Sequence, residues 1–291
     1  MKLYSASTIR ELEAKHDFHL SKSLGQNFLT DKGIIDQIIE GAEIGEDDLV
    51  IEIGPGIGVL TAEAAQRAKK VVAVEIDQSL IPILKETLAE FDNIEIVNRD
   101  ILKTDINALI EEHGSGTKGV KIIGNLPYYI TTPIVMKILE DGVRADSIIV
   151  MMQKEVADRI KSKPAKKTYG ALSVAVQYYC TAEAIVDVPR SVFVPQPNVD
   201  STVLKLSVRP ERPVELIDEK VFFETVKGGF GQRRKTLSNA LSGVCGMDKT
   251  AAAQVLAAAE IDPIRRAETL DLNEFARLAN EVAKWRDSKK Q

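Results

Sequence analysis

The sequence predicts an α/β domain with a doubly wound, mostly parallel sheet, followed by a small all-helical domain. From residue 49 onward, short continuous apolar runs alternate with segments of helical periodicity. Such runs are typical of strands that helices cover on both faces of a sheet. Residues 218–285 are rich in alanine and helical in pattern, without strand signals. We therefore expect a layered α/β fold and then a helical C-terminal domain.

Seven apolar runs predict the strands of the sheet. A helical stretch near 168–180 precedes the last two, which a proline-rich loop separates. The segment RPERP at 209–213 indicates a linker. We therefore predict a larger domain at 1–208, to which 1–30 contributes an N-terminal segment, and a helical domain at 209–291. The predicted strands are 49–53, 71–76, 94–98, 120–125, 147–153, 182–188 and 202–208.

Composition favours a globular protein with a sizeable core, since 44% of the 291 residues are hydrophobic. No segment approaches the ~20 apolar residues that cross a bilayer, and no apolar secretory core is visible. The two cysteines, Cys180 and Cys245, lack metal-ligand spacing. We expect both to be buried small apolar residues, and we expect no metal site. The prediction is a monomeric cytoplasmic protein that binds no membrane.

Charge is distributed unevenly along the chain, although the net charge is −5. Residues 31–150 carry 11 Lys and Arg against 22 Asp and Glu, whereas residues 151–291 carry 23 against 18. The run RIKSKPAKK at 159–167 holds five cations and no anion. Such a run is either a solvated loop or a contact for a polyanion, and the charge separation favours the polyanion somewhat.

A glycine-rich turn follows the first predicted strand in EIGPGIGVLT, residues 52–61. Gly54, Gly56 and Gly58 permit positive φ angles and close approach of a ligand, and the helix that follows offers unpaired N–H groups. The spacing differs from the usual dinucleotide fingerprint. A tight packing turn is the alternative interpretation.

Two acidic residues strengthen the ligand interpretation. Glu75 ends the second strand, 21 positions after Gly54, where a carboxylate can accept both hydroxyls of a ribose. Asp100 ends the third strand and can accept an amino hydrogen of an adenine. Each could instead be a plain turn residue. Together they predict an adenosine-containing cofactor, either a nicotinamide dinucleotide or S-adenosylmethionine.

The fourth strand ends in Asn125, Leu126, Pro127 and Tyr128. The Asn125 amide oxygen and the Leu126 carbonyl can both accept hydrogen bonds from the exocyclic amine of an adenine, which orients its nitrogen lone pair. Pro127 restricts Leu126 to extended geometry. Tyr128 offers a ring on which the base can stack, a contact worth ~1–3 kcal/mol. The alternative is a strand-end turn with two tyrosines. Transfer of a sulfonium methyl needs mainly orientation and electrostatic placement, so these groups suffice.

In combination, these motifs resemble the KsgA/RsmA rRNA adenine dimethyltransferases, which have a Rossmann-like S-adenosylmethionine fold. The resemblance extends over nearly the whole chain. Its motifs are KSLGQNFL (22–29), EIGPGIGVLT (52–61), VEID (74–77), RDIL (99–102), NLPYYITTP (125–133), MMQKEVADRI (151–160), FVPQPNVDS (193–201) and GQRRKTL (231–237).

The resemblance implies transfer of four methyl groups from S-adenosylmethionine to two adjacent adenosines in a hairpin loop near the 3′ end of 16S rRNA. The catalytic domain would be 1–208, and 209–291 would contact rRNA. Phe193 would face Tyr128 across the target base. Tyr129, where relatives often have Asn, is expected to be a packing residue. The implied cofactor residues are Asn27, Leu29, Gly54, Gly56, Glu75, Asp100, Ile101 and Asn125. The implied rRNA contacts are Arg159, Lys161, Lys163, Lys166, Lys167, Arg233, Arg234 and Lys235.

Several alternatives stay open at this point. A resistance-type dimethyltransferase of large-subunit rRNA shares the fourth-strand motif but usually has NIPY. A DNA adenine methyltransferase more often has PPY or PPF. A ribosome-assembly binding module would use the fold only to dock, which intact Gly54, Glu75, Asp100 and Asn125 argue against as a sole role. A nicotinamide oxidoreductase lacks support from the glycine spacing.

Overall fold

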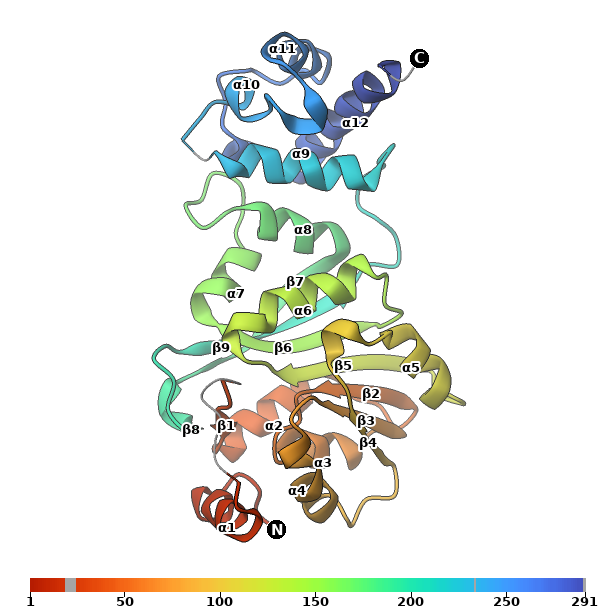
Figure 1. Ribbon diagram of the computed structural model, residues 1–291, viewed down its shortest axis with the longest axis vertical. Helices are drawn as coiled ribbons and strands as arrows, with labels where there is room; N and C mark the ends of the chain where they lie inside the picture. Colours follow the sequence, from red (N-terminus) through yellow and green to blue (C-terminus); the bar gives the residue numbers. More distant parts are fainter. Residues whose placement is uncertain (19–24, 233, 290–291) are drawn as a thin grey trace. The chain divides into compact units, whose positions relative to one another are not determined.

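The computed structural model describes residues 1–18, 25–232 and 234–289. Its centre is a seven-stranded sheet in the order β4-β3-β2-β5-β6-β9-β7, and a separate two-stranded ribbon pairs β1 with β8 (Figure 1). Strands β2 to β6 pair in parallel, and β9 pairs antiparallel with β6. The strands are β1 Phe28–Leu29, β2 Asp48–Ile53, β3 Lys70–Glu75, β4 Ile94–Asn98, β5 Gly119–Asn125, β6 Ser147–Gln153, β7 Cys180–Val188, β8 Phe193–Val194 and β9 Ser201–Val208.

The inner apolar runs form strands that are buried on both faces, whereas β4 and β7 at the sheet edges are partly exposed. Leu49, Val50 and Ile51 of β2 are all fully buried, and so are Val71 and Val72 of β3. Continuous burial is the property that a parallel sheet covered by helices requires. All seven predicted strands are confirmed, with ends that differ by at most two residues. The short ribbon of β1 and β8 was not predicted, because two residues give no periodicity.

Helices connect the strands and make up the C-terminal part of the chain. Those from α2 to α6 alternate with β2 to β6, as a doubly wound sheet requires. The helices are α1 Ala6–His16, α2 Lys32–Gly41, α3 Val59–Ala65, α4 Ile81–Thr87, α5 Ile106–His113, α6 Tyr128–Glu140, α7 Lys154–Ile160, α8 Ala171–Tyr179, α9 Glu219–Gly231, α10 Leu237–Ala240, α11 Lys249–Ala258 and α12 Leu272–Ser288. Short 3-10 turns are η1 Gln78–Leu80, η2 Ile101–Lys103, η3 Arg190–Val192, η4 Val244–Gly246 and η5 Ala267–Thr269.

The chain divides into two compact units. One contains Met1–Ala157 and Ala182–Val208, and the other contains Asp158–Thr181 and Arg209–Gln291. The second unit thus includes 158–181, which the sequence analysis placed within 1–208. The two functional domains proposed from the sequence stay a prediction.

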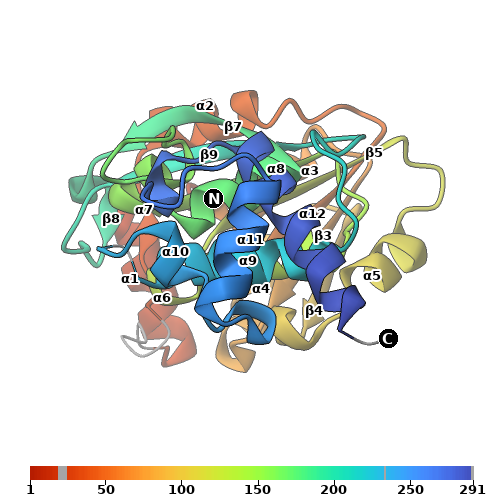
Figure 2. The same ribbon diagram turned by 90° about the horizontal axis from the view of Figure 1, so that it is seen from above.

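The second unit has an aromatic core of its own. In it, α9 packs against α12, which also contacts α11, and the views in Figures 1 and 2 show these helices side by side. Tyr169 of the preceding loop packs edge-on against Phe230 and donates a hydrogen bond to the Leu270 carbonyl at 3.0 Å. Tyr179 stacks on Phe223. These contacts explain why the 158–181 segment belongs with the C-terminal helices.

The two cysteines have different environments. Cys180 is fully buried, as predicted, and burial raises the pKa of its thiol to about 12. The prediction is wrong for Cys245, which is partly exposed and whose thiol contacts Glu224 Oε2 at 3.2 Å. Cys245 lies in a turn and itself has a positive φ of 50°. Nothing in the residue pattern indicates this turn.

None of the helices in the described parts of the chain is long and apolar enough to span a membrane.

Candidate active site

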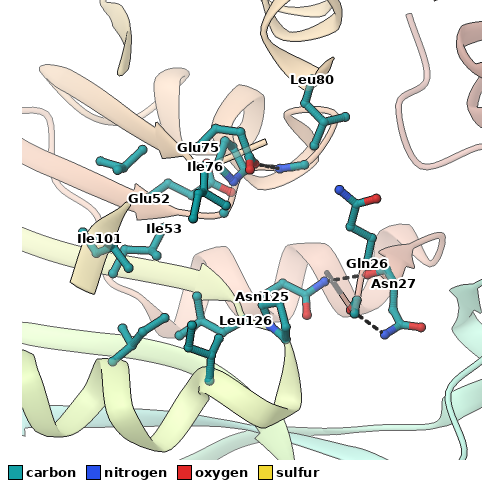
Figure 3. Close-up of a pocket in the computed structure, with 18 of the residues that line it drawn as sticks. Gln26, Asn27, Glu52, Ile53, Glu75, Ile76, Leu80, Ile101, Asn125 and Leu126 are labelled. Atoms are coloured by element: carbon teal, nitrogen blue, oxygen red, sulfur yellow. Dashed lines mark hydrogen bonds between the residues drawn. The ribbon is translucent and has the colours of Figure 1, made fainter. Parts of the chain in front are cut away.

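A pocket lies where β2, β3 and β5 end, next to the segment around β1 (Figure 3). Figure 3 shows Glu52, Glu75 and Ile76 on one side of it, with Asn125, Leu126, Gln26 and Asn27 on the other. All predicted cofactor residues and four of the five predicted catalytic residues line this pocket. They are Asn27, Leu29, Gly54, Gly56, Glu75, Asp100, Ile101, Asn125, Leu126, Pro127 and Tyr128.

Phe193 is the predicted catalytic residue that does not belong to the lining of this pocket. It is 3% exposed and pairs in β8 with Leu29 of β1, which does line the pocket. Its proposed contact with the target base stays a prediction.

Two glycines of the turn after β2 have different surroundings. Gly54 and Gly56 have φ angles of +66° and +61°, a region that favours glycine. A Cβ on Gly56 would lie 2.8 Å from the Phe28 ring, whereas a Cβ on Gly54 would meet nothing within 4 Å. Gly54 therefore borders space that a ligand can fill, and Gly56 is also needed for packing.

Glu75 ends β3, as predicted, and is only 4% exposed. Its two carboxyl oxygens accept hydrogen bonds from the backbone N–H groups of Asp77, at 2.8 Å, and Gly56, at 3.3 Å. Burial raises the pKa of Glu75 to about 7, although both N–H donors favour the charged form. The Asn98 side chain donates to the Glu75 carbonyl at 2.8 Å and so holds the strand end. The sequence analysis did not single out Asn98.

Asp100 does not end a strand, which corrects the sequence prediction. β4 ends at Asn98, and Asp100 caps the η2 turn by accepting a hydrogen bond from the Leu102 N–H at 3.0 Å. The strand has the predicted bounds of 94–98, and Asp100 lies two residues beyond it, where its carboxylate bonds to the backbone as Asp does in turns. Asp100 still lines the pocket, and its contact with an adenine stays a prediction.

Glu52 is a pocket residue that the sequence analysis missed. It lies in the buried strand β2 and is 1% exposed, and its Oε2 has no hydrogen-bond partner within the part of the chain that the structure describes. Burial, with a smaller contribution from the nearby Glu75, raises the pKa of Glu52 to about 8. A glutamate within a continuous apolar strand was the available signal. Its buried carboxyl belongs to the lining of the pocket and can exchange a hydrogen bond with a ligand there.

Asn125 ends β5, and its side chain is fixed by the N-terminal segment. Its amide Nδ2 donates to the Asn27 backbone carbonyl at 2.9 Å, and Asn27 Nδ2 donates to the Gly25 carbonyl at 3.0 Å (Figure 3). Gln26 donates to Asp77 at 2.8 Å, which ties the same segment to the end of β3. The Asn125 amide therefore keeps its Oδ1 as a hydrogen-bond acceptor for the pocket.

The carbonyls of Leu126 and Pro127 have different roles. The Pro127 carbonyl accepts from the Ile130 N–H at 3.0 Å and the Thr131 N–H at 3.2 Å in the first turn of α6. Among the described residues, the Leu126 carbonyl has only a long contact of 3.5 Å with the Thr131 hydroxyl. Leu126 thus offers a carbonyl that the helix does not use.

The two adjacent tyrosines differ in their surroundings. The Tyr128 hydroxyl lies 2.7 Å from the hydroxyl of Ser201, which is fully buried at the start of β9. Burial raises the pKa of Tyr128, so the phenol stays neutral. Tyr129 was expected to be a packing residue, and that expectation is wrong, because it is 62% exposed and lines the pocket. The first turn of α6 directs it outward.

The two basic segments belong to the same helical unit. Residues 263–270 lie next to both, since the Ala165 N–H donates to the Glu268 carbonyl and the Leu237 N–H to the Arg265 carbonyl, each at 2.7 Å. Arg266 of this linking segment is exposed and was not predicted. Of the predicted RNA contacts, Arg233 lies outside the described residues. The others, Arg159, Lys161, Lys163, Lys166, Lys167, Arg234 and Lys235, are exposed.

No cluster of three or more potential metal ligands occurs within residues 1–18, 25–232 and 234–289.

Sequence comparison finds relatives that match nearly the whole chain. The family model described as "Ribosomal RNA adenine dimethylase" matches residues 17–278. A protein of Clostridioides difficile named "Ribosomal RNA small subunit methyltransferase A" is 54% identical, with 96% of each chain covered. Proteins of the same name from Alkaliphilus metalliredigens and Bacillus cytotoxicus are 53% and 52% identical, covering 97% and 93% of this chain and 98% and 94% of theirs.

Two solved structures share the fold. A dimethyladenosine transferase from Plasmodium falciparum has a TM-score of 0.76 and 27% identity, covering 88% of this chain and 98% of its own. The 23S rRNA methyltransferase ErmE has a TM-score of 0.66 and 28% identity, covering 88% of this chain and 99% of its own.

The geometry at Glu75 generates a prediction about cofactor binding. If ribose hydroxyls donate to its carboxylate, they favour the charged form. Affinity for S-adenosylmethionine should then be highest above pH 7 and fall as the pH drops below the pKa of about 7 in the unbound protein. Glu75→Ala should weaken binding by about 1.5–3 kcal/mol at pH 8, the scale of hydrogen bonds to a charged group.

Titration calorimetry between pH 6 and 8.5 measures both effects. Glu75→Gln is the matched control, because it keeps the size of the side chain but cannot titrate. A wild-type pH profile that persists unchanged in this variant would remove Glu75 from the cofactor site.

Proposed function

This chain belongs to the ribosomal RNA adenine dimethylase family, and we propose that it dimethylates the N6 amines of two adjacent adenosines in the 3′-terminal hairpin loop of 16S rRNA. The observation that carries the proposal is the orientation of Asn125, whose Nδ2 is held by Asn27 so that Oδ1 can accept. The substrate would be the small ribosomal subunit or its precursor, and the protein would serve ribosome biogenesis in the cytoplasm.

Two acceptors of the chain hold the target amine. Before the first transfer, Oδ1 of Asn125 and the carbonyl of Leu126 accept its two hydrogens, which orients the nitrogen lone pair away from both. When the nitrogen has taken a methyl group it releases one proton to water, so the monomethylated amine has one hydrogen left for one of the two acceptors in the second transfer. The α6 helix uses the Pro127 carbonyl instead, so the Leu126 carbonyl stays available. No side chain has to change its charge for this step, and catalysis rests on position and preorganised dipoles.

Tyr128 supplies the surface on which the base stacks. Its ring is half-buried, and its hydroxyl is fixed by the contact with Ser201. A ring that is already held in place loses little side-chain entropy when a base binds. A hairpin loop suits this pocket, because a loop base needs little unstacking before it enters.

The residues at the ends of β2, β3 and β4 fit S-adenosylmethionine. When bound, S-adenosylmethionine supplies an electrophilic methyl group on a sulfonium sulfur. Glu75 would bind the ribose, Asp100 and Ile101 would contact the adenine, and the open side of Gly54 would border the cofactor. The buried Glu52 carboxyl, whose Oε2 has no partner among the described residues, is a further hydrogen-bonding group in the lining of the pocket.

The small subunit is favoured over the large subunit as the substrate. The sequence identity of the chain is 54% to a protein named as a small-subunit methyltransferase and 28% to the 23S enzyme. A role restricted to docking would leave the arrangement of Asn125 and Leu126 without a purpose.

Mapping of labelled methyl groups tests the proposal. The protein is incubated with labelled S-adenosylmethionine and under-methylated small subunits, large subunits or bare 16S rRNA. We expect label on the N6 amines of two neighbouring adenosines of the small subunit. Asn125→Ala should bind the cofactor almost normally and transfer at least 100-fold more slowly, the scale of losing one oriented acceptor.

The control for this variant is cofactor affinity by calorimetry, which shows that the fold and the cofactor site survive. Full transfer by Asn125→Ala would contradict the mechanism. Label on the large subunit alone would contradict the substrate.

Ser201 should act as a positioning residue for Tyr128. Ser201→Ala removes the hydroxyl contact, so the Tyr128 ring can tilt and the target base is held less well. We expect kcat to fall about fivefold with unchanged cofactor affinity, since one neutral hydrogen bond is worth about 1 kcal/mol.

Tyr128→Phe is the matched variant, because it removes the same hydrogen bond from the other side. The kcat of the double variant should be no lower than that of either single variant. Additive losses would show that the two residues act separately.

The exposed cations of the helical unit should contribute to rRNA binding through phosphate contacts. Changing Lys163, Lys166 and Arg234 to Gln should weaken binding and lower the slope of log affinity against log salt, by about 0.7–0.9 for each phosphate that is no longer neutralised. Filter binding to small subunits between 50 and 300 mM salt measures this slope.

Lys2→Gln with Lys85→Gln is the control, because both are exposed cations of the other unit. If the triple variant keeps the wild-type affinity and slope, these segments are only solvated.

A further inference from the structure

Tyr129 is an exposed aromatic side chain at the mouth of the proposed active site. It is 62% exposed and lines the pocket at the start of α6. Within the described residues it is the one aromatic among the exposed large apolar side chains. Aromatic rings kept in water at a pocket mouth are typical of binding surfaces, since nothing in the fold gains from their exposure.

The backbone of the N-terminal segment supports this ring. Gly25 has a φ of +62°, and a Cβ on it would lie 3.4 Å from Cε1 and 3.7 Å from Cδ1 of Tyr129 and 3.1 Å from Cβ of Pro127. The Tyr129 ring thus lies within van der Waals distance of the space beside Gly25, whereas a side chain at this position would be crowded by Pro127. One edge of the ring is supported, while most of its surface faces water.

The position of Tyr129 relates it to the target base rather than to the cofactor. Ile76 is also an exposed apolar residue of the pocket lining, at 55% exposure, but it follows Glu75 on the cofactor side. Tyr129 instead follows Tyr128 on the Asn125 side. A base that enters the pocket from an RNA strand arrives with covalently linked neighbours, and these must remain at the mouth.

We infer that Tyr129 stacks on the nucleobase next to the target adenosine and so holds the flanking nucleotide while the target base is in the pocket. This inference rests on the proposed function and extends its binding site by one nucleotide. Stacking on an aromatic ring tolerates any base. The same ring can therefore hold the base that flanks the target on that side, whichever of the two adenosines is in the pocket.

Kinetics of the Tyr129 variants test this contact. The flanking stack is present before and during methyl transfer, so its loss raises KM without changing kcat. We expect Tyr129→Ala to raise KM for small subunits about tenfold, within the range of one base stack. Tyr129→Phe should restore it, because the flat ring remains, and Tyr129→Leu should not. Ile217→Ala, an exposed apolar residue outside the pocket lining, is the control.

The decisive experiment uses two kinds of reconstituted small subunit, in which the nucleotide before or the nucleotide after one target adenosine is abasic. With one of these two particles, the KM of the wild type should rise about tenfold, as it does for Tyr129→Ala with intact particles. Tyr129→Ala should show no further rise in KM with that particle. Equal effects of the variant on intact and abasic particles would overturn the inference, as would a weakened affinity for S-adenosylmethionine, which would place the ring over the cofactor.

The two proposals fail in different ways. Normal transfer by the wild type together with an unchanged KM for Tyr129→Ala overturns this inference alone. Absence of transfer by the wild type to any small subunit overturns the proposed function and this inference with it.

Discussion

Parallel pairing of β2, β3 and β5 is the constraint on which the site depends. Strands that run in the same direction end at the same edge, so residues far apart in the sequence meet there. In the order β4-β3-β2-β5-β6, the chain winds outward in opposite directions from β2 and β5, and the connections that leave these two strands separate and open a crevice. The glycine turn, Glu75 and Asn125 meet at this edge for that reason alone.

Hydrogen bonds within the fold then select which polar atoms remain for a ligand. The segment before β1 accepts one of the two amide hydrogens of Asn125, and the first turn of α6 takes the Pro127 carbonyl. The Asn125 amide oxygen and the Leu126 carbonyl remain as a pair of acceptors. An exocyclic amine with two hydrogens matches this pair. The fit to an amine thus follows from the hydrogen bonds that the fold has already made.

The sequence predicted those parts of the structure that depend on local pattern. Continuous apolar runs located the strands, and strand ends located Glu75 and Asn125. Contacts between distant residues could not be predicted in this way: Ser201 meets Tyr128 across 73 positions, and 158–181 joins the C-terminal helices through side-chain packing. Glu52 was missed because the glycines beside it dominate its motif, although its burial makes it the more perturbed carboxyl.

Tyr128 and Tyr129 show how neighbouring residues of one type acquire different roles. Successive side chains on a helix point about 100° apart, so at the start of α6 only one of the two can turn toward the interior. The buried hydroxyl of Ser201 selects Tyr128, because a phenol inside the fold needs a hydrogen-bond partner. Tyr129 is then directed to the mouth, where its ring lies near the backbone of Gly25. The inward ring lies where a captured base would be, and the outward ring lies where the strand carrying that base must pass.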